Sequence, residues 1–210
     1  MSDPVDVSGF HIEATRLLAQ QVPPDTVQWS AAPTQAVEEE AIDDGRAAIR
    51  NRAARAIIPQ SFIRMSELVV LHRDPQRFSL LYRALWRLVY EPELKHDLGD
   101  CDLARLRQMA QAVRRDIQKM KVRLAFRPLP IRGEAVPVAW YEPAHYVAES
   151  VGAWLARRDP QSRWILLTPD RSMHWDGTRL LSAPALAPMA HGLAMTDEER
   201  VRALEGLPWL

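Results

Sequence analysis

Apolar residues recur three and four positions apart through most of the first half of the chain, which is the pattern of amphipathic helices. This spacing predicts four helices, over residues 10–21, 61–72, 77–90 and 103–120. Pro23 and Pro92 follow two of them, since proline cannot continue a helix. Asp74 and Pro75 suit the cap and the first position of the third helix. Between the first two helices, residues 27–29 fit a short strand.

The period changes to two from Val122 onward, which indicates strands. Val122, Leu124 and Phe126 fall on one side of the expected strand, and Arg123 and Arg127 fall on the other. The later pattern predicts a returning strand, a helix, two further strands and a last short helix, over residues 138–141, 145–158, 163–167, 173–175 and 197–204. We therefore expect an α+β protein, with a helical N-terminal half packed on a C-terminal β-β-α-β-β unit.

Changes in composition suggest three parts of the chain. Residues 1–58 are expected to form a short N-terminal unit and a linker, residues 59–182 the helical core with the β-β-α-β-β unit, and residues 183–210 a Pro/Ala-rich tail with a short helix. The linker carries an acidic run at 37–44 and a basic, alanine-rich run at 45–55, and we interpret it as a solvated connector.

The composition excludes several classes of protein. The chain has 210 residues, 47% of them hydrophobic, and a formal net charge of zero, which is ordinary for a globular protein. Cys101 is the single cysteine, which excludes an internal disulfide framework, a multi-thiolate zinc site and a cysteine-ligated iron–sulfur cluster. No signal peptide or membrane-spanning run is evident, so we expect a cytoplasmic protein without membrane contact. Motifs for phosphate loops, hydrolases and metalloproteases are missing, and no metal or cofactor is expected.

Charge is concentrated on the fourth predicted helix and the start of the strand after it. Residues 105–127 hold eight basic side chains against one acidic side chain, Asp116. At about 100° per residue, three cations align beside the apolar stripe and two form a second row on the solvent side: Arg107, Arg114 and Lys121, and then Arg115 and Lys119. Arg123 and Arg127 could extend the row onto the strand. Such rows suit a phosphate backbone. The alternative is a solvated face paired with the acids of residues 38–44.

A second candidate lies in residues 168–177, around a turn and a strand. Trp175 could stack on a base while Arg171 and His174 reach phosphate or base edges. The alternative is a capped turn, in which Asp170 and Ser172 bind local amides, Trp175 lies in the core and Asp176-Gly177 forms the next tight turn.

Two further pairs of residues have the chemistry of an acid and a base. Glu142 and His145 lie just ahead of a predicted helix, and His72 lies close to Asp74 at the start of another. Residues of these types more often cap the ends of helices, and we favour that role for both pairs.

The resemblance to a known family rests on four stretches of sequence. They are residues 72–88 (HRDPQRFSLLYR through WRL), 109–120 (MA through VRRDIQKM), 138–143 (VAWYEP) and 164–177 (W through TPDRSMHWDG). Across residues 9–180 the chain resembles a bacterial domain-of-unknown-function family that is described as a DNA metabolism or repair protein. Family members occur beside a radical-SAM protein of presumed DNA-modifying function, or fused ahead of a uracil-DNA glycosylase-like domain. The resemblance implies neither catalytic residues nor glycosylase activity for this chain.

These observations lead to a hypothesis with two alternatives. The favoured function is a non-catalytic DNA-binding or adaptor module in DNA repair or modification, with a radical-SAM or uracil-DNA glycosylase-like protein as its partner. One alternative is an enzyme or enzyme half-site acting on a base or nucleotide, with His174, Asp170, Glu142 and His145 in one pocket. The other is a scaffold whose basic face docks an acidic protein.

Overall fold

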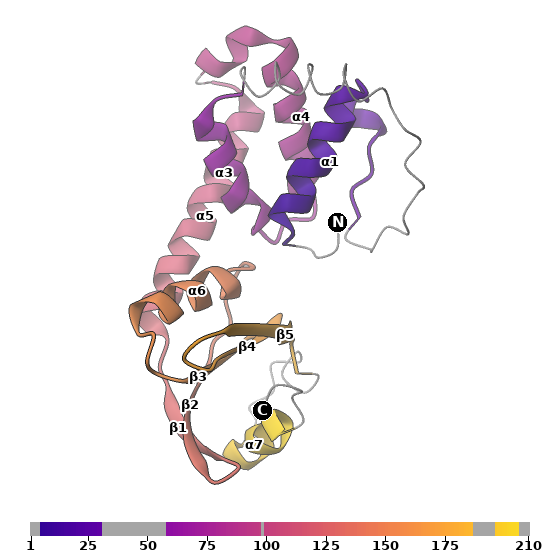
Figure 1. Cartoon of the computed structure of the whole chain (residues 1–210). Helices are drawn as coiled ribbons and strands as arrows, with labels where there is room; N and C mark the ends of the chain where they lie inside the picture. Colours follow the sequence, from indigo (N-terminus) through magenta and orange to yellow (C-terminus); the bar gives the residue numbers. More distant parts are fainter. Residues whose placement is uncertain (1–4, 31–57, 98, 187–195, 206–210) are drawn as a thin grey trace. The chain divides into compact units, whose positions relative to one another are not determined.

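The computed structural model describes residues 5–30, 58–97, 99–186 and 196–205 of the chain. It confirms an α+β protein, in which helices come first and a mixed five-stranded sheet follows (Figure 1). The chain divides into two compact units, unit 1 over Met1–Arg114 and unit 2 over Arg115–Leu210. Within the part of the chain that is described, no helix is both long and apolar enough to cross a bilayer.

Unit 1 is helical, and its order follows the predicted pattern. Its elements are α1 (Val7–Ala19), the 3₁₀ helix η1 (Pro24–Thr26), α3 (Gln60–Val70), α4 (Arg77–Tyr90), the 3₁₀ helix η2 (Pro92–His96) and the first part of α5 (Cys101–Arg123). The apolar face of α4 is fully buried at Leu81, Tyr82 and Ala84. It packs with apolar residues of α1, α3 and α5 in one core. The predicted bounds of α4 are confirmed at both ends.

An aromatic cluster replaces the short strand predicted at residues 27–29. No strand of the described sheet includes these residues, and Trp29 packs against Phe10, Phe78 and Tyr82 with ring centroids 5.1, 6.0 and 5.7 Å away. The Tyr82 hydroxyl donates to the Val22 carbonyl at 2.7 Å. Burial of the indole ring, rather than strand pairing, therefore decides the conformation of this segment.

The helix α5 begins at Cys101, two residues before the predicted start at residue 103. The Asp100 carboxylate accepts from the Leu103 amide at 2.9 Å, so Asp100 caps the helix. Asp102 lies two residues after Asp100 and binds arginines of α4. The Asp74 carboxylate accepts from the Gln76 amide at 2.8 Å, in the turn ahead of α4. Because α4 begins at Arg77 with Gln76 as its N-cap, the predicted cap at Asp74 and first helical position at Pro75 are wrong.

The strand predicted from Val122 is wrong, because α5 continues to Arg123. The Val122 side chain is 83% exposed, and the Leu124 amide still donates to the Met120 carbonyl at 2.9 Å. The first strand begins at Arg127, five residues later than predicted. A short alternation cannot override a helix whose apolar stripe continues to the fully buried Met120.

Unit 2 is built on a sheet with the strand order β1-β2-β3-β4-β5. Its elements are the end of α5, β1 (Arg127–Ile131), β2 (Glu134–Trp140), α6 (Ala148–Arg158), β3 (Trp164–Leu167), β4 (Arg171–Trp175), β5 (Leu180–Pro184) and α7 (Asp197–Glu205). Only the β2–β3 pair is parallel, with α6 as the crossover between the two strands. The unit is therefore β-β-α-β-β-β-α, with one strand more than predicted.

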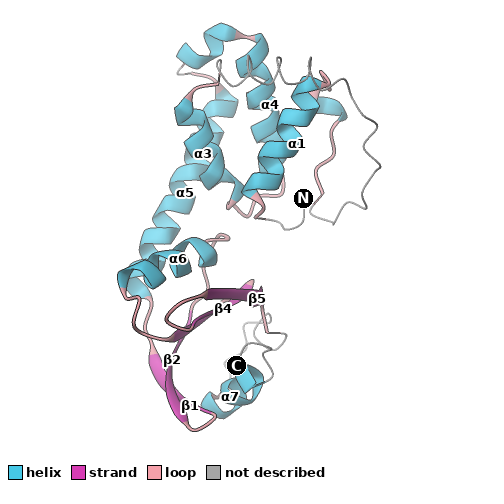
Figure 2. Ribbon diagram, in the orientation of Figure 1, coloured by secondary structure: helices cyan, strands magenta, loops and turns pink. Residues whose placement is uncertain are grey.

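The two faces of the sheet are covered by different helices (Figure 2). Gly152 of α6 lies so close to Met173 that a Cβ there would be 2.5 Å from the methionine Cε. Leu204 of α7 shares a core with Leu129 and Ile165. Cross-strand pairing puts Ile165 opposite His174 and Leu166 opposite Met173, so alternate residues of β4 face α7 and α6.

Two predictions fall on other parts of the chain. The linker expected within residues 1–58 lies mostly outside the described residues, and residues 187–195 and 206–210 of the predicted tail lie outside them too. The short helix expected at 197–204 is confirmed as α7.

Candidate nucleic-acid interface

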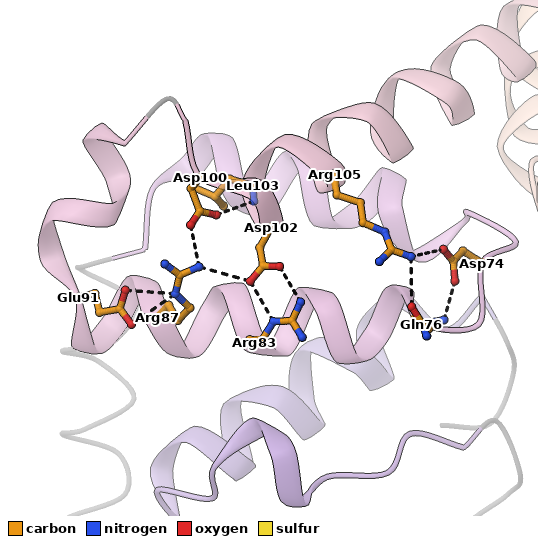
Figure 3. Close-up of polar contacts among 9 residues, drawn as sticks. All are labelled: Asp74, Gln76, Arg83, Arg87, Glu91, Asp100, Asp102, Leu103 and Arg105. Carbon is orange, nitrogen blue, oxygen red and sulfur yellow. Dashed lines mark hydrogen bonds and ion pairs between the residues drawn. The ribbon is translucent and has the colours of Figure 1, made fainter.

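An ion-pair network joins α4 to the start of α5 within unit 1 (Figure 3). Arg83 forms two hydrogen bonds with the Asp102 carboxylate, at 2.9 and 2.6 Å. Arg87 reaches Asp100 at 2.7 Å, Asp102 at 3.3 Å and Glu91 at 3.1 Å. The hydrogen bond from Arg83 lowers the pKa of Asp102, against the opposing effect of burial. We call Arg83, Arg87, Glu91, Asp100 and Asp102 the α4–α5 network.

The first cation of the basic segment is also paired. Arg105 donates to Asp74 at 2.9 Å and to Gln76 at 3.2 Å, at the opposite end of α4 (Figure 3). Although burial acts to raise the pKa of Asp74, hydrogen bonds from the Gln76 amide and Arg105 lower it overall. Arg105 and the acids around it therefore form part of the folded framework.

Arg107 and Arg114 of α5 are placed differently from Arg105. Both side chains are exposed, and neither forms an ion pair with a described acidic residue. The acids of residues 38–44, which the sequence offered as alternative partners, lie outside the described residues. Unit 1 therefore presents two exposed arginines that no described acidic residue pairs with.

These two arginines line a pocket of about 290 Å³ that lies wholly within unit 1. Its apolar wall includes Phe62, Leu88 and Leu103, each no more than 6% exposed. The complete lining comprises residues of α3 and the position before it, of α4, of η2 and of α5: Pro59, Ser61, Phe62, Met65, Leu88, Lys95, Leu103, Arg107, Ala110, Gln111 and Arg114. The pocket thus combines apolar side chains with three cations, one of which is Lys95.

In unit 2 the single acid of the basic segment does not neutralise its neighbours. Asp116 is 6% exposed and accepts from the His145 amide at 2.8 Å. Burial, together with the charge of Asp116, raises the pKa of Tyr141. The cations Arg115, Lys119 and Arg123 are exposed and form no ion pair within the described residues.

Lys121 and Arg158 share one aromatic ring in unit 2. The Lys121 Nζ lies 4.7 Å from the ring centroid of Trp154, and the Arg158 guanidinium carbon lies 5.0 Å from it. Cation–π attraction holds both charges at this ring. Lys121 is therefore half-buried and partly engaged, whereas Arg115 and Lys119 are fully available to an anion.

The structure divides Arg171, His174 and Trp175 between the two faces of the sheet. Arg171 and Trp175 lie on the α6 face, where Arg171 approaches Glu149 at 3.4 Å. His174 lies on the α7 face and is 9% exposed, and burial lowers its pKa. The Trp175 indole donates to the Pro160 carbonyl at 3.1 Å. These three side chains consequently do not form one base-binding surface.

The turns on either side of β4 are held by local hydrogen bonds. The Thr168 hydroxyl accepts from the Arg171 amide at 3.0 Å, so Thr168 helps to close the first turn. Hydrogen bonds from the Arg179 amide and from Thr178 lower the pKa of Asp176 to about 2. These local hydrogen bonds fit the capped-turn interpretation, although Trp175 is half-buried and does not lie in the core as that interpretation expected.

The residues considered for acid–base chemistry have structural contacts. The His72 ring accepts from the Asp74 amide at 3.1 Å ahead of α4. His145 lies in the loop before α6, where its amide binds Asp116, while His174 faces α7. Neither His145, Glu142 nor His174 lines the pocket of unit 1. No three His, Cys, Asp or Glu residues among those described are grouped to hold a metal ion.

Two relevant cations were missed from the sequence. Lys95 lies in the short η2 helix, ahead of the basic segment, and reaches the pocket only through the fold. Arg158 is the last residue of α6. The sequence shows the Arg157-Arg158 pair but does not indicate which side chain Arg158 contacts. The roles of Lys95 and Arg158 both depend on contacts between elements that are distant in the sequence.

Comparison with known proteins assigns the chain to a family without assigning an activity. A family model described as domain of unknown function DUF4130 matches residues 75–203, which include α4, α5 and all five strands. The chain matches no curated protein and no solved structure. Because the family model matches more than half of the 210 residues, the chain belongs to the DUF4130 family of domains of unknown function.

Proposed function

We propose that the protein is a non-catalytic DNA-binding or adaptor module that acts in DNA repair or modification. In this proposal the cations of α5 beyond Arg105 bind phosphate groups. They fall into two groups, Arg107 and Arg114 in unit 1 and Arg115, Lys119, Lys121 and Arg123 in unit 2. Arg171, His174 and Trp175 are left out of the binding surface, since His174 lies on the opposite face of the sheet from Arg171 and Trp175.

The distribution of ion pairs supports this proposal most directly. Asp74, Asp100 and Asp102 bind arginines, and Asp116 is buried against the His145 amide. The α5 cations beyond Arg105 have no described acidic partner. A surface stabilised mainly by internal salt bridges would pair these groups, whereas a phosphate-binding surface keeps them exposed.

The assignment to repair or modification is supported by the family resemblance of residues 9–180. The same resemblance supports a radical-SAM or uracil-DNA glycosylase-like protein as the partner of an adaptor. Incubation of the purified chain with uracil-containing duplex DNA tests the proposal that the protein is not a catalyst. We expect binding without release of the base or cleavage of the strand, and release of uracil would contradict the proposal.

The binding surface is tested by fluorescence anisotropy with labelled duplex and single-stranded DNA. The test variant is Arg114→Gln/Arg115→Gln/Lys119→Gln. The matched control is Arg64→Gln/Arg179→Gln/Arg202→Gln, which removes the same charge from exposed arginines that lie outside α5. We expect only the first triple variant to lower affinity strongly for every sequence. Equal losses in both would show that net charge, and not α5, governs binding.

A further inference from the structure

We infer that the pocket of unit 1 binds a nucleoside-phosphate unit, with the phosphate at Lys95, Arg107 and Arg114 and the base against the apolar wall. This inference rests on the proposed function, because two of the three cations belong to the α5 surface. It goes further by assigning an occupant to the pocket. It also adds Lys95, which lies outside α5.

The size of the pocket restricts what can enter. Its volume of about 290 Å³ lies near the lower end for small-molecule sites, roughly 300 Å³. A bare phosphate would not contact the apolar wall, and a DNA duplex is too wide to enter the pocket. One base with its sugar and phosphate is of suitable size for a space of this kind.

The lining chemistry agrees with the two halves of a nucleotide. Phe62, Leu88 and Leu103 are nearly fully buried and turn apolar surface toward the pocket, where a base can pack. Ser61 and Gln111 add a hydroxyl and an amide that can hydrogen-bond a base edge or a sugar.

The cations supply the charge that an anionic ligand requires. Lys95, Arg107 and Arg114 are exposed, and none forms an ion pair with a described acid. A nucleotide phosphate carries up to two negative charges, so it relieves repulsion among three nearby cations. An apolar ligand of the same size would leave these cations unmatched.

The test measures binding of 2′-deoxyadenosine 5′-monophosphate by isothermal titration calorimetry at low salt, with deoxyadenosine as the uncharged comparison. We expect the nucleoside to bind at least about tenfold more weakly, since it lacks the charge-assisted hydrogen bonds to phosphate. Lys95→Gln and Arg107→Gln should each weaken nucleotide binding about tenfold. Arg64→Gln, on α3 but outside the pocket, should leave it unchanged.

A second variant tests the pocket through its shape. Ala110 is 3% exposed and lines the pocket, so Ala110→Met places a longer side chain in the space. We expect it to weaken nucleotide binding about tenfold while duplex binding is unchanged. Thermal unfolding checks that the Ala110→Met variant folds. If that variant does not fold, the Lys95→Gln variant, whose side chain is exposed, still tests the pocket.

Two sources of the ligand are separated by a pentanucleotide with or without a 5′-phosphate. Tighter binding of the phosphorylated strand than of the mononucleotide would identify a strand end as the occupant, and equal binding would identify a free nucleotide. Equal binding of nucleotide and nucleoside, or binding of neither, would overturn the inference. If duplex binding by wild type still weakens with salt, that outcome leaves the proposed function intact.

Discussion

At the scale of single residues, the partner of Asp116 in the structure differs from the one that its sequence neighbours suggest. In the sequence it is one carboxylate among eight cations, where a surface ion pair is the obvious expectation. In the structure it is buried and accepts the His145 amide. The charge of the segment was therefore predictable, but the partner of its one acid depends on a loop 29 residues away.

The role of Asp116 can be tested by comparing two substitutions. Asp116→Leu leaves the His145 amide without its acceptor, and we expect it to lower the free energy of unfolding by about 1–3 kcal/mol. Asp116→Asn keeps an oxygen that can accept, so its cost should be under about 1 kcal/mol. Urea unfolding of both variants measures the difference, and equal costs would show that the hydrogen bond contributes little.

Asp102 provides a residue-level prediction for pH dependence. Its pKa is lowered below the ordinary value of 3.8, chiefly by the hydrogen bond from Arg83. The stabilisation is therefore complete above the ordinary pKa and is lost as pH falls through the lowered, folded-state value. Because the Arg83 side chain is half-exposed, solvent weakens the stabilisation by the ionised Asp102. We expect Asp102→Asn to lower the free energy of unfolding by about 1 kcal/mol at pH 7.

The measurement for Asp102 is the urea midpoint of wild type and Asp102→Asn at several pH values from 7 to 3. We expect the gap between the two proteins to be constant near neutral pH and to narrow below about pH 4. A gap that stays constant down to pH 3 would contradict the assigned pKa shift.

At the scale of elements, the helices with clear boundaries were the most predictable. Both ends of α4 were predicted because a strong apolar spacing lies between Pro75 and Pro92. The end of α5 was missed because Val122 and Leu124 imitate a strand over a few residues. The strand β5 was missed because its sequence, LLSAP, resembles a loop and is held by pairing with β4.

The candidate site was predictable only where one element supplies it. The cations of α5 could be identified from helical spacing alone. The separation of His174 from Arg171 and Trp175 follows from the period of two along β4, which the sequence already contained. The pocket of unit 1 could not be predicted, because its lining comes from four helices whose packing the pattern does not specify.

Packing of α6 on the sheet yields a prediction for Gly152. A Cβ at this position would lie 2.5 Å from the Met173 Cε and 3.0 Å from its Sδ. Met173 is flexible but only 1% exposed, so its side chain has little room to move aside. Gly152→Val should therefore lower the free energy of unfolding by about 2 kcal/mol, despite the better helix propensity of valine. Ser150→Val on the exposed side of α6 is the control, and chemical unfolding of the two variants should show a clear difference. Equal stability would mean that α6 and β4 adjust without cost.

At the scale of the whole molecule, the net charge is zero, but the described acidic and basic side chains differ in how many of them form ion pairs. Acids near α4 and α5 are bound within the fold, while cations along α5 remain exposed. Membership of the DUF4130 family supplies no activity to explain this arrangement. A direct binding measurement on the full chain is therefore required.

The most direct test is the slope of log affinity against log salt concentration for duplex DNA, measured for wild type and the Arg114/Arg115/Lys119 glutamine variant. We predict a steep negative slope for wild type, which becomes shallower by about two to three in the variant, at roughly 0.9 per lost phosphate contact. An unchanged slope in the variant, or no binding by wild type at low salt, would contradict the proposal that α5 binds DNA.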